Sequence, residues 1–168
     1  MNYTSSVGPI EFKNFMAEVP TCVAIVATQI DTGIQACTVS SLTSFDVETP
    51  GIMVVLQKHS RTLDAIKRSS VFSANILSQD QTSLAQHFSS KTKKSDSEES
   101  QFFEFSQLLV TPFLKSCQGV IFCKLERVLD MEHASVIFGR VIGLEKFKND
   151  LPLVYFKRKY FTLGDSLP

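Results

Sequence analysis

Short apolar runs bounded by turn residues dominate the hydrophobic pattern of this chain. Runs of four to eight β-branched and apolar residues are typical of strands, and residues 71–77 also alternate between apolar and polar side chains, as a half-buried strand does. Asp31-Thr32-Gly33 separates two of the runs and reads as a hairpin turn. The predicted strands cover residues 22–29, 34–41, 42–46, 51–57, 71–77, 118–129, 135–146, 152–156 and 160–163.

Helical spacing appears in only three short segments. The first contains apolar residues at i, i+3, i+4 and i+7 and ends at Pro20. Ser60 is placed to cap the second segment, and Ser78 with Gln81 forms a capping box before the third. The predicted helices cover residues 9–19, 62–68 and 78–88.

Many strands and few helices indicate a mainly β fold. An antiparallel barrel is the economical arrangement, because closure leaves few exposed sheet edges. The 168 residues suit one domain with a substantial core. Residues 89–100 contain no large apolar side chain and are expected to form a flexible surface loop within that domain.

Charge and composition narrow the classes of partner. The formal net charge is zero, so no excess of positive charge exists to displace counterions, and we expect no nucleic-acid partner. No apolar run approaches the length that spans a membrane, and the first residues lack a basic region followed by an apolar core. We therefore expect a cytoplasmic protein that is neither secreted nor inserted in a membrane.

Cysteine and histidine spacing does not indicate a metal site or a hydrolase. The four cysteines form no C-x-x-C pair and are most simply small buried hydrophobes. The histidines lack metal-ligand spacing, and no G-x-S-x-G elbow supports a Ser-His-acid hydrolase. His59 could border an anion site or lie in a solvent-facing turn, His87 falls within a predicted helix, and His133 reads by spacing alone as a surface-turn residue.

Residues 33–62 carry the strongest candidate chemistry. Hydroxyl-rich segments at 38–44 and 60–62 flank one apolar strand, and Arg61 lies in the second segment. If the segments converge, their hydroxyls and backbone N–H groups could bind an anion, with Arg61 supplying charge. A polar strand face followed by a turn explains the same pattern and is the commoner arrangement.

The order of motifs in this stretch resembles the short-chain NAD(P)H:flavin reductase family, the flavin reductase-like split-barrel domains. Gly33 precedes a small-residue Thr/Ser run, Pro50 precedes the apolar strand, and Ser60-Arg61-Thr62 follows it. The resemblance spans about residues 10–163. Further matching residues, in the same order, are Asn75, Ile76, Leu77, Leu84, Ala85, Phe88, Pro112, His133, Gly139, Val141, Pro152, Leu153, Val154, Tyr155 and Tyr160.

This resemblance implies a fold, an activity and partners. The fold is an FMN-binding split β-barrel of Greek-key type, and the protein is a homodimer with flavin at the subunit interface. The implied activity is hydride transfer from NADH or NADPH to FMN or FAD, with reduced flavin passing to a flavin-dependent monooxygenase. The implied sites are Thr38, Val39, Ser40 and Ser41 for the flavin ring edge and ribityl chain, Ser60, Arg61 and Thr62 for the phosphate, Phe88 beside the cofactor, and His133 for orienting the nicotinamide.

Several residues depart from the family pattern. Met131 and Glu132 precede His133 where the family has Gly and Asp, and Cys22 and Arg158 occupy positions that are usually Gly. Two alternatives stay open. One, which Met131, Glu132 and Arg158 keep open, is a flavin- or haem-binding module without reductase activity. The other, within the same fold, is a flavoprotein that holds FMN tightly and reduces a different acceptor.

Overall fold

The computed structural model describes residues 7–90, 99–107, 110–147 and 150–164. The predicted loop at 89–100 therefore lies largely outside the described residues. No described helix combines the length and apolar character needed to cross a membrane. The elements are α1 (Pro9–Met16), β1 (Thr21–Cys22), β2 (Ala24–Ile30), β3 (Gly33–Val39), β4 (Thr43–Asp46), β5 (Gly51–Gln57), α2 (Arg61–Ser69), β6 (Val71–Ile76), α3 (Thr82–Ser89), β7 (Phe103–Phe105), β8 (Pro112–Leu114), β9 (Gly119–Asp130), β10 (Ala134–Lys146), β11 (Leu153–Phe156) and β12 (Lys159–Thr162).

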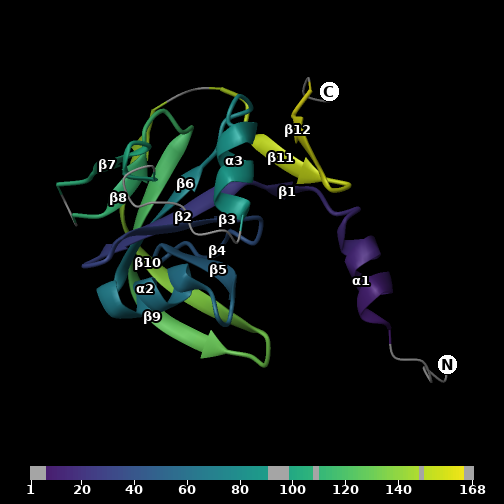
Figure 1. Ribbon diagram of the computed structural model, residues 1–168, viewed down its shortest axis with the longest axis horizontal. Helices are drawn as coiled ribbons and strands as arrows, with labels where there is room; N and C mark the ends of the chain where they lie inside the picture. Colours follow the sequence, from purple (N-terminus) through teal and green to yellow (C-terminus); the bar gives the residue numbers. More distant parts are fainter. Residues whose placement is uncertain (1–6, 91–98, 108–109, 148–149, 165–168) are drawn as a thin grey trace.

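A seven-stranded antiparallel sheet organises the molecule, in the strand order β3-β2-β6-β9-β10-β5-β4 (Figure 1). Its two end strands, β3 and β4, form no ladder with each other among the described residues. Smaller sheets, β1-β11-β12 and β7-β8, lie beside it. The prediction of a mainly β fold is confirmed, and the main sheet is open between its ends, as in a split barrel.

Both faces of the central strands are buried. Along β2, Val26 belongs to a core cluster that includes Leu63 and Ile66 of α2, whereas Ile25 belongs to a second cluster under α3, β8 and β11. Such double burial explains why β2 reads as a continuous apolar run and not as an alternating one. The helix predicted after Ser60 is confirmed, with its apolar side chains facing inward as expected.

The start of α3 differs from the prediction. The Ser78 N–H donates to Gln81 Oε1 at 3.0 Å, which is one half of the predicted capping box. The helix nevertheless begins at Thr82 with Gln81 as its N-cap, because residue 78 instead forms a β-bridge with Pro152. The β-bridge between Ser78 and Pro152 thus keeps the first residues of the predicted helix out of α3. Strands β7 and β8 were not predicted.

Helix α1 stands apart from the sheets in Figure 1. The predicted amphipathic spacing is present, but none of its residues is buried. The helix is tied to the β11–β12 turn, where the Lys157 N–H donates to the Ala17 carbonyl at 2.8 Å and Lys157 pairs with Glu18 at 3.1 Å. Its apolar side chains, including Ile10 and Phe15, therefore face solvent in this chain.

Candidate functional site

A cleft of about 660 Å³ lies where the end of β3 approaches β5 and the start of α2. Its volume falls within the range of ordinary cofactor pockets, which is about 300–1,000 Å³. The C-terminal end of α3 closes one side. All eight residues predicted to bind the cofactor line this one cleft: Thr38, Val39, Ser40, Ser41, Ser60, Arg61, Thr62 and Phe88.

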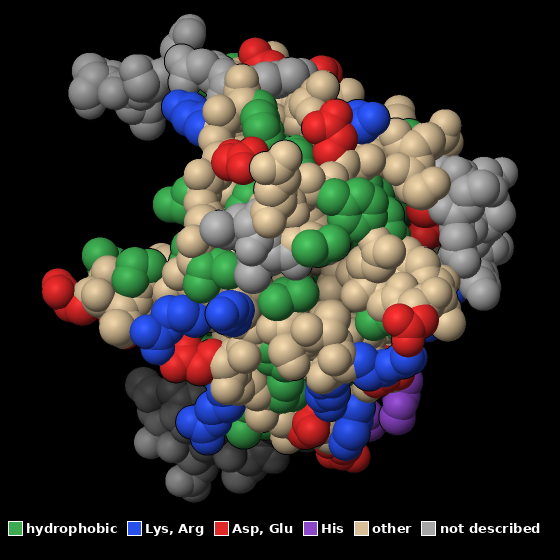
Figure 2. Space-filling model, turned by 90° about the vertical axis from the view of Figure 1, so that its left-hand side faces the viewer, with side chains coloured by type: hydrophobic (Ala, Val, Ile, Leu, Met, Phe, Trp, Pro, Cys, Tyr) green, Lys and Arg blue, Asp and Glu red, His purple; other side chains and the backbone are tan. Residues whose placement is uncertain are grey.

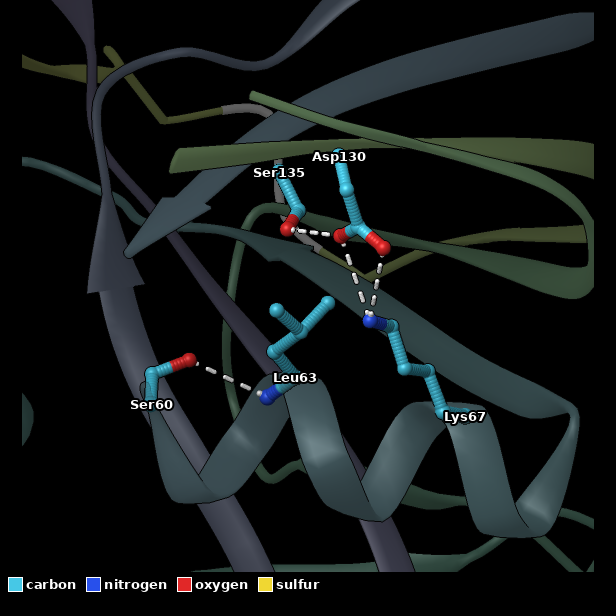
Figure 3. A network of polar contacts seen from close by, with 5 residues as sticks. All are labelled: Ser60, Leu63, Lys67, Asp130 and Ser135. Carbon is cyan, nitrogen blue, oxygen red and sulfur yellow. Dashed lines mark hydrogen bonds and ion pairs between the residues drawn. The ribbon is translucent and has the colours of Figure 1, made fainter. Parts of the chain in front are cut away.

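The start of α2 gives one end of the cleft the character of an anion site. Ser60 is the N-cap, and its Oγ accepts a hydrogen bond from the Leu63 N–H at 3.1 Å (Figure 3). An accepting hydroxyl still has its own proton to donate, and the amides of Arg61 and Thr62 have no acceptor within the helix. Among the described residues, the exposed Arg61 guanidinium forms no ion pair. These donors and the positive end of the helix dipole suit a phosphate group.

Two of the predicted hydroxyls are already engaged with the protein. Thr38 Oγ1 donates to the Ala85 carbonyl of α3 at 2.7 Å. Ser41 Oγ both donates to the Val55 carbonyl and accepts from the Val55 N–H, each at 3.0 Å. The Ser41 side chain thereby links the end of β3 to β5. The contact lies on β5 past the part of that strand that pairs with β4. At this end of the cleft, the exposed Ser40 hydroxyl has no protein partner among the described residues.

Thr62 and Phe88 are buried walls of the cleft. Thr62 is buried, and its side chain hydrogen-bonds the Cys37 thiol. Burial raises the pKa of Cys37, so the thiol stays protonated and unreactive at neutral pH. Phe88 packs edge-on against Phe103, with ring centroids 5.6 Å apart, and so presents a rigid apolar surface.

His133 does not line the cleft. It lies at the tip of the β9–β10 hairpin with an exposed side chain, and its Nε2 is 3.6 Å from Glu132 Oε1. Its carbonyl accepts a hydrogen bond from the Lys58 N–H at 3.2 Å, which holds the hairpin tip beside the turn that leads to Ser60. The structure therefore brings His133 near the phosphate end of the cleft but leaves its imidazole in solvent.

A polar network fixes this hairpin to α2 (Figure 3). Lys67 Nζ of α2 lies 3.2 Å from Asp130 Oδ1, and Ser135 Oγ donates to the same oxygen at 2.5 Å. Asp130 and Ser135 are opposite each other in the hairpin register. The hydrogen bonds from Ser135 and Lys67 hold the pKa of Asp130 below its ordinary value, so the carboxylate is charged at neutral pH.

Several lining residues were not predicted as site residues. Gln57 is the last residue of β5, His59 lies in the turn before α2, and Cys37 precedes Thr38 on β3. His59 was weighed from the sequence as a possible neighbour of an anion site, and the structure places it in the lining. Glu99 also lines the cleft, and no motif in the sequence distinguished it from its neighbours.

Positive and negative side chains are mixed on the face shown in Figure 2. Figure 2 shows Lys and Arg interleaved with Asp and Glu over the lower part of one face, and apolar side chains across its centre. The mixture agrees with a formal net charge of zero. The hydrogen-bond donors at the start of α2 are therefore the local groups in this cleft that suit an anion.

The chain belongs to the flavin reductase like domain family, whose model matches residues 16–164. It is 30% identical over 159 residues to the reductase subunit HsaB of a flavin-dependent monooxygenase from Rhodococcus jostii, covering 92% of this chain and 78% of that protein. It is 27% identical to the FMN reductase (NADH) RutF of Bradyrhizobium diazoefficiens, covering 96% and 89% of the two chains.

Solved structures agree with the fold. The structure of BorF, the flavin reductase component of a bacterial two-component tryptophan halogenase, superposes with a TM-score of 0.86 at 19% identity. That alignment covers 95% of this chain and all of BorF. The predicted family membership and the split-barrel fold are confirmed.

Proposed function

We propose that this protein is an NADH-dependent flavin reductase that binds FMN in the cleft between β3, β5 and α2. The observation that carries the proposal is the convergence of the eight predicted residues on one cleft, with anion donors at one end and an aromatic wall at the side. RutF of Bradyrhizobium diazoefficiens, an FMN reductase (NADH), supports FMN and NADH as the ligands to test first.

The residues divide the cleft into two ends. Ser60, Arg61 and Thr62 bind the phosphate through a hydroxyl, a guanidinium and the first amides of α2. At the other end, the segment Thr38–Ser41 borders the flavin ring and ribityl chain through backbone groups and the available Ser40 hydroxyl. Phe88 borders the cofactor with its apolar face.

The protein's contribution is binding and orientation. Bound flavin would supply the redox chemistry by accepting a hydride from the dihydronicotinamide ring. The chain's own residues would hold the reacting rings in position, exclude water along the buried Val39 and Phe88, and balance the phosphate charge with Arg61. Because neither a nucleophile nor a metal is required, no catalytic dyad is needed in the cleft.

His133 is proposed to orient the nicotinamide nucleotide from the hairpin tip. The hydrogen bond from the Lys58 N–H and the Lys67–Asp130 contact support this role, since both hold the tip beside the cleft. Its exposed imidazole is free to meet a second bound molecule. An unchanged KM for NADH in a His133→Asn variant would show that His133 does not orient the nicotinamide nucleotide.

The proposed assembly is a cytoplasmic homodimer that supplies reduced flavin to a monooxygenase. Exposed apolar side chains of α1, such as Ile10 and Phe15, support a second copy as a partner, and sedimentation equilibrium should give twice the chain mass of 18.7 kDa. HsaB is the reductase subunit of a flavin-dependent monooxygenase, which supports an oxygenase partner. The cysteines, which are thiols and not disulfides, suit a reducing compartment.

Ligand binding and turnover together test the function. FMN should bind more tightly than riboflavin, which lacks the phosphate, and NADH oxidation should depend on added or bound flavin. If FMN binds but the protein oxidises neither NADH nor NADPH, the protein is a non-catalytic flavin-binding module and not a reductase. Equal affinity for FMN and riboflavin would show that the start of α2 does not bind the flavin phosphate.

A further inference from the structure

Two consecutive residues of β3, Cys37 and Thr38, connect this strand to the two helices that border the cleft. Both residues line the cleft. Side chains alternate between the two faces of a strand, so neighbouring residues point in opposite directions. Cys37 packs against the core cluster that contains Leu63 of α2, whereas Thr38 hydrogen-bonds α3. The end of β3 therefore contacts a different helix with each of its faces.

The Thr38 hydroxyl holds the C-terminal half of α3. Its Oγ1 donates to the Ala85 carbonyl at 2.7 Å, and Ala85 is fully buried. Phe88 follows three residues later on the same face of the helix and belongs to the same core cluster as Ala85. A helix of eight residues is too short to be stable without tertiary contacts. The bond from Thr38 therefore helps to fix where Phe88 stands as the apolar wall of the cleft.

The Cys37 thiol makes the corresponding contact with the start of α2. It hydrogen-bonds the side chain of Thr62, which is buried. Thr62 lies in the first turn of α2, directly after Arg61 and close to the N-cap Ser60. A hydroxyl rotates to suit its hydrogen-bond partner, so the thiol sets the orientation of the Thr62 side chain. This orientation is set at the end of the cleft that is proposed for the phosphate.

We propose that Cys37 and Thr38 are positioning residues for flavin reduction, each acting on one end of the cleft. Thr38 positions Phe88 beside the flavin ring, and Cys37 positions Thr62 beside the phosphate. The inference rests on the proposed flavin reductase function. It changes the role of Thr38, whose hydroxyl serves α3 and not the cofactor. Because the two contacts lie on opposite faces of β3, the two ends of the cleft should respond independently to substitution.

Affinities for FMN and riboflavin separate the two ends, because riboflavin lacks the phosphate. Thr38→Val keeps the branched shape of the side chain and loses the hydroxyl. It should raise the Kd for both flavins by about two- to tenfold, the range for one neutral hydrogen bond. It should also lower kcat for NADH oxidation at saturating FMN, since the flavin is held less precisely. Thr38→Ser retains a hydroxyl and should recover most of both losses.

Cys37→Ala should affect only the phosphate end. Its Kd for FMN should rise by about two- to tenfold, whereas its Kd for riboflavin should stay at the wild-type value. The preference for FMN over riboflavin therefore falls in Cys37→Ala and is unchanged in Thr38→Val. Cys37→Ser places a hydroxyl where the thiol was and should restore the preference.

Double variants test whether each residue acts through its partner. In a Phe88→Ala background, where the ring is absent, Thr38→Val should change neither Kd further. If that background does not fold, Phe88→Leu replaces it, and the effect of Thr38→Val should then be smaller than in wild type. In a Thr62→Val background, Cys37→Ala should leave the preference for FMN unchanged. Effects as large as in wild type would show that Thr38 and Cys37 do not act through these partners and would overturn the inference.

Thr28 of β2 provides a matched control for loss of stability. Its Oγ1 donates to the Val71 carbonyl at 2.7 Å, the same length as the Thr38 bond, but Thr28 does not line the cleft. Thr28→Val should lower the urea midpoint and leave the Kd for both flavins unchanged. If Thr28→Val loses flavin affinity as Thr38→Val does, the losses reflect stability and not position, and the inference is wrong.

The outcomes separate this inference from the proposed function. If the wild-type protein reduces FMN with NADH but the Thr38 and Cys37 variants bind both flavins as it does, the positioning roles are wrong and the reductase stands. An equal change in the preference for FMN in Thr38→Val and Cys37→Ala would also overturn the inference, because the two ends would not be independent. If the wild-type protein binds neither flavin, the proposed function fails and the inference fails with it.

Discussion

Ser41 offers a sharp test, because the sequence and the structure assign its hydroxyl different partners. The family resemblance implies that it contacts flavin, whereas the structure uses it to join β3 to β5 through the Val55 N–H and carbonyl. Val55 pairs with Val136 of β10 on its other edge. The Ser41 hydroxyl thus hydrogen-bonds the Val55 N–H and the Val55 carbonyl, which a further strand would otherwise bond.

The Ser41→Ala substitution removes both hydrogen bonds. Each neutral hydrogen bond contributes about 0.5–1.5 kcal/mol, so two contribute about 1–3 kcal/mol to the free energy of unfolding. Val55 is 40% exposed, and water can replace the lost partner, which favours the lower half of that range. With a urea m-value of about 2 kcal/mol/M, the unfolding midpoint of the flavin-free protein should fall by about 0.5–1 M.

The neighbouring Ser40→Ala variant is the control. Its hydroxyl is exposed and has no protein partner among the described residues, so the free energy of unfolding should stay within about 0.5 kcal/mol of wild type. Its FMN affinity, measured by fluorescence titration, should weaken by about two- to tenfold. A Ser41→Ala protein with the wild-type midpoint would refute the argument that this side chain stabilises the fold by linking the end of β3 to β5.

Three further predictions follow from other contacts. Arg61→Ala should weaken FMN binding by about 1.5–3 kcal/mol, because it removes a charged hydrogen bond; an unchanged Kd for FMN would remove Arg61 from the site. Gly139→Ala should lower the free energy of unfolding by about 1–3 kcal/mol, because its Cβ would lie 2.5 Å from Phe72 Cζ, whereas Gly164→Ala meets nothing within 4 Å and serves as the control. The pKa of Asp130 is lowered on folding, so its contribution to stability is present above the ordinary carboxyl value of 3.8 and is lost as the pH falls through the lower folded value. The urea midpoint of wild type should therefore exceed that of Asp130→Asn at neutral pH, and the difference should close below pH 3.8; a pH-independent difference would contradict this.

The strands were predictable because their signals are local. Apolar runs and turn residues located the long β9–β10 hairpin and the strands around Gly33 without any tertiary information. The start of α3 was mistaken, since the pairing of Ser78 with Pro152 depends on a segment far away in sequence. The short strands β7 and β8 give too few residues for a periodic signal.

The positions of the site residues were more predictable than their contacts. The order of hydroxyl clusters around one strand allowed 38–41 and 60–62 to meet, and the family resemblance favoured a shared site; the two segments line one cleft. Local pattern could not show that Ser41 bonds Val55, because that contact depends on where the sheet stays open. Nor could it show that Arg158 adopts φ 61°, a left-handed conformation that explains why glycine is usual there.

Anaerobic mixing of the FMN-loaded protein with NADH tests the central claim most directly. The account predicts that the visible absorbance of the bound flavin is lost after addition of one equivalent of NADH. It also predicts that Arg61→Ala requires more FMN to reach the same loading. A flavin spectrum that remains unchanged after excess NADH or NADPH would contradict the claim that this cleft supports flavin reduction.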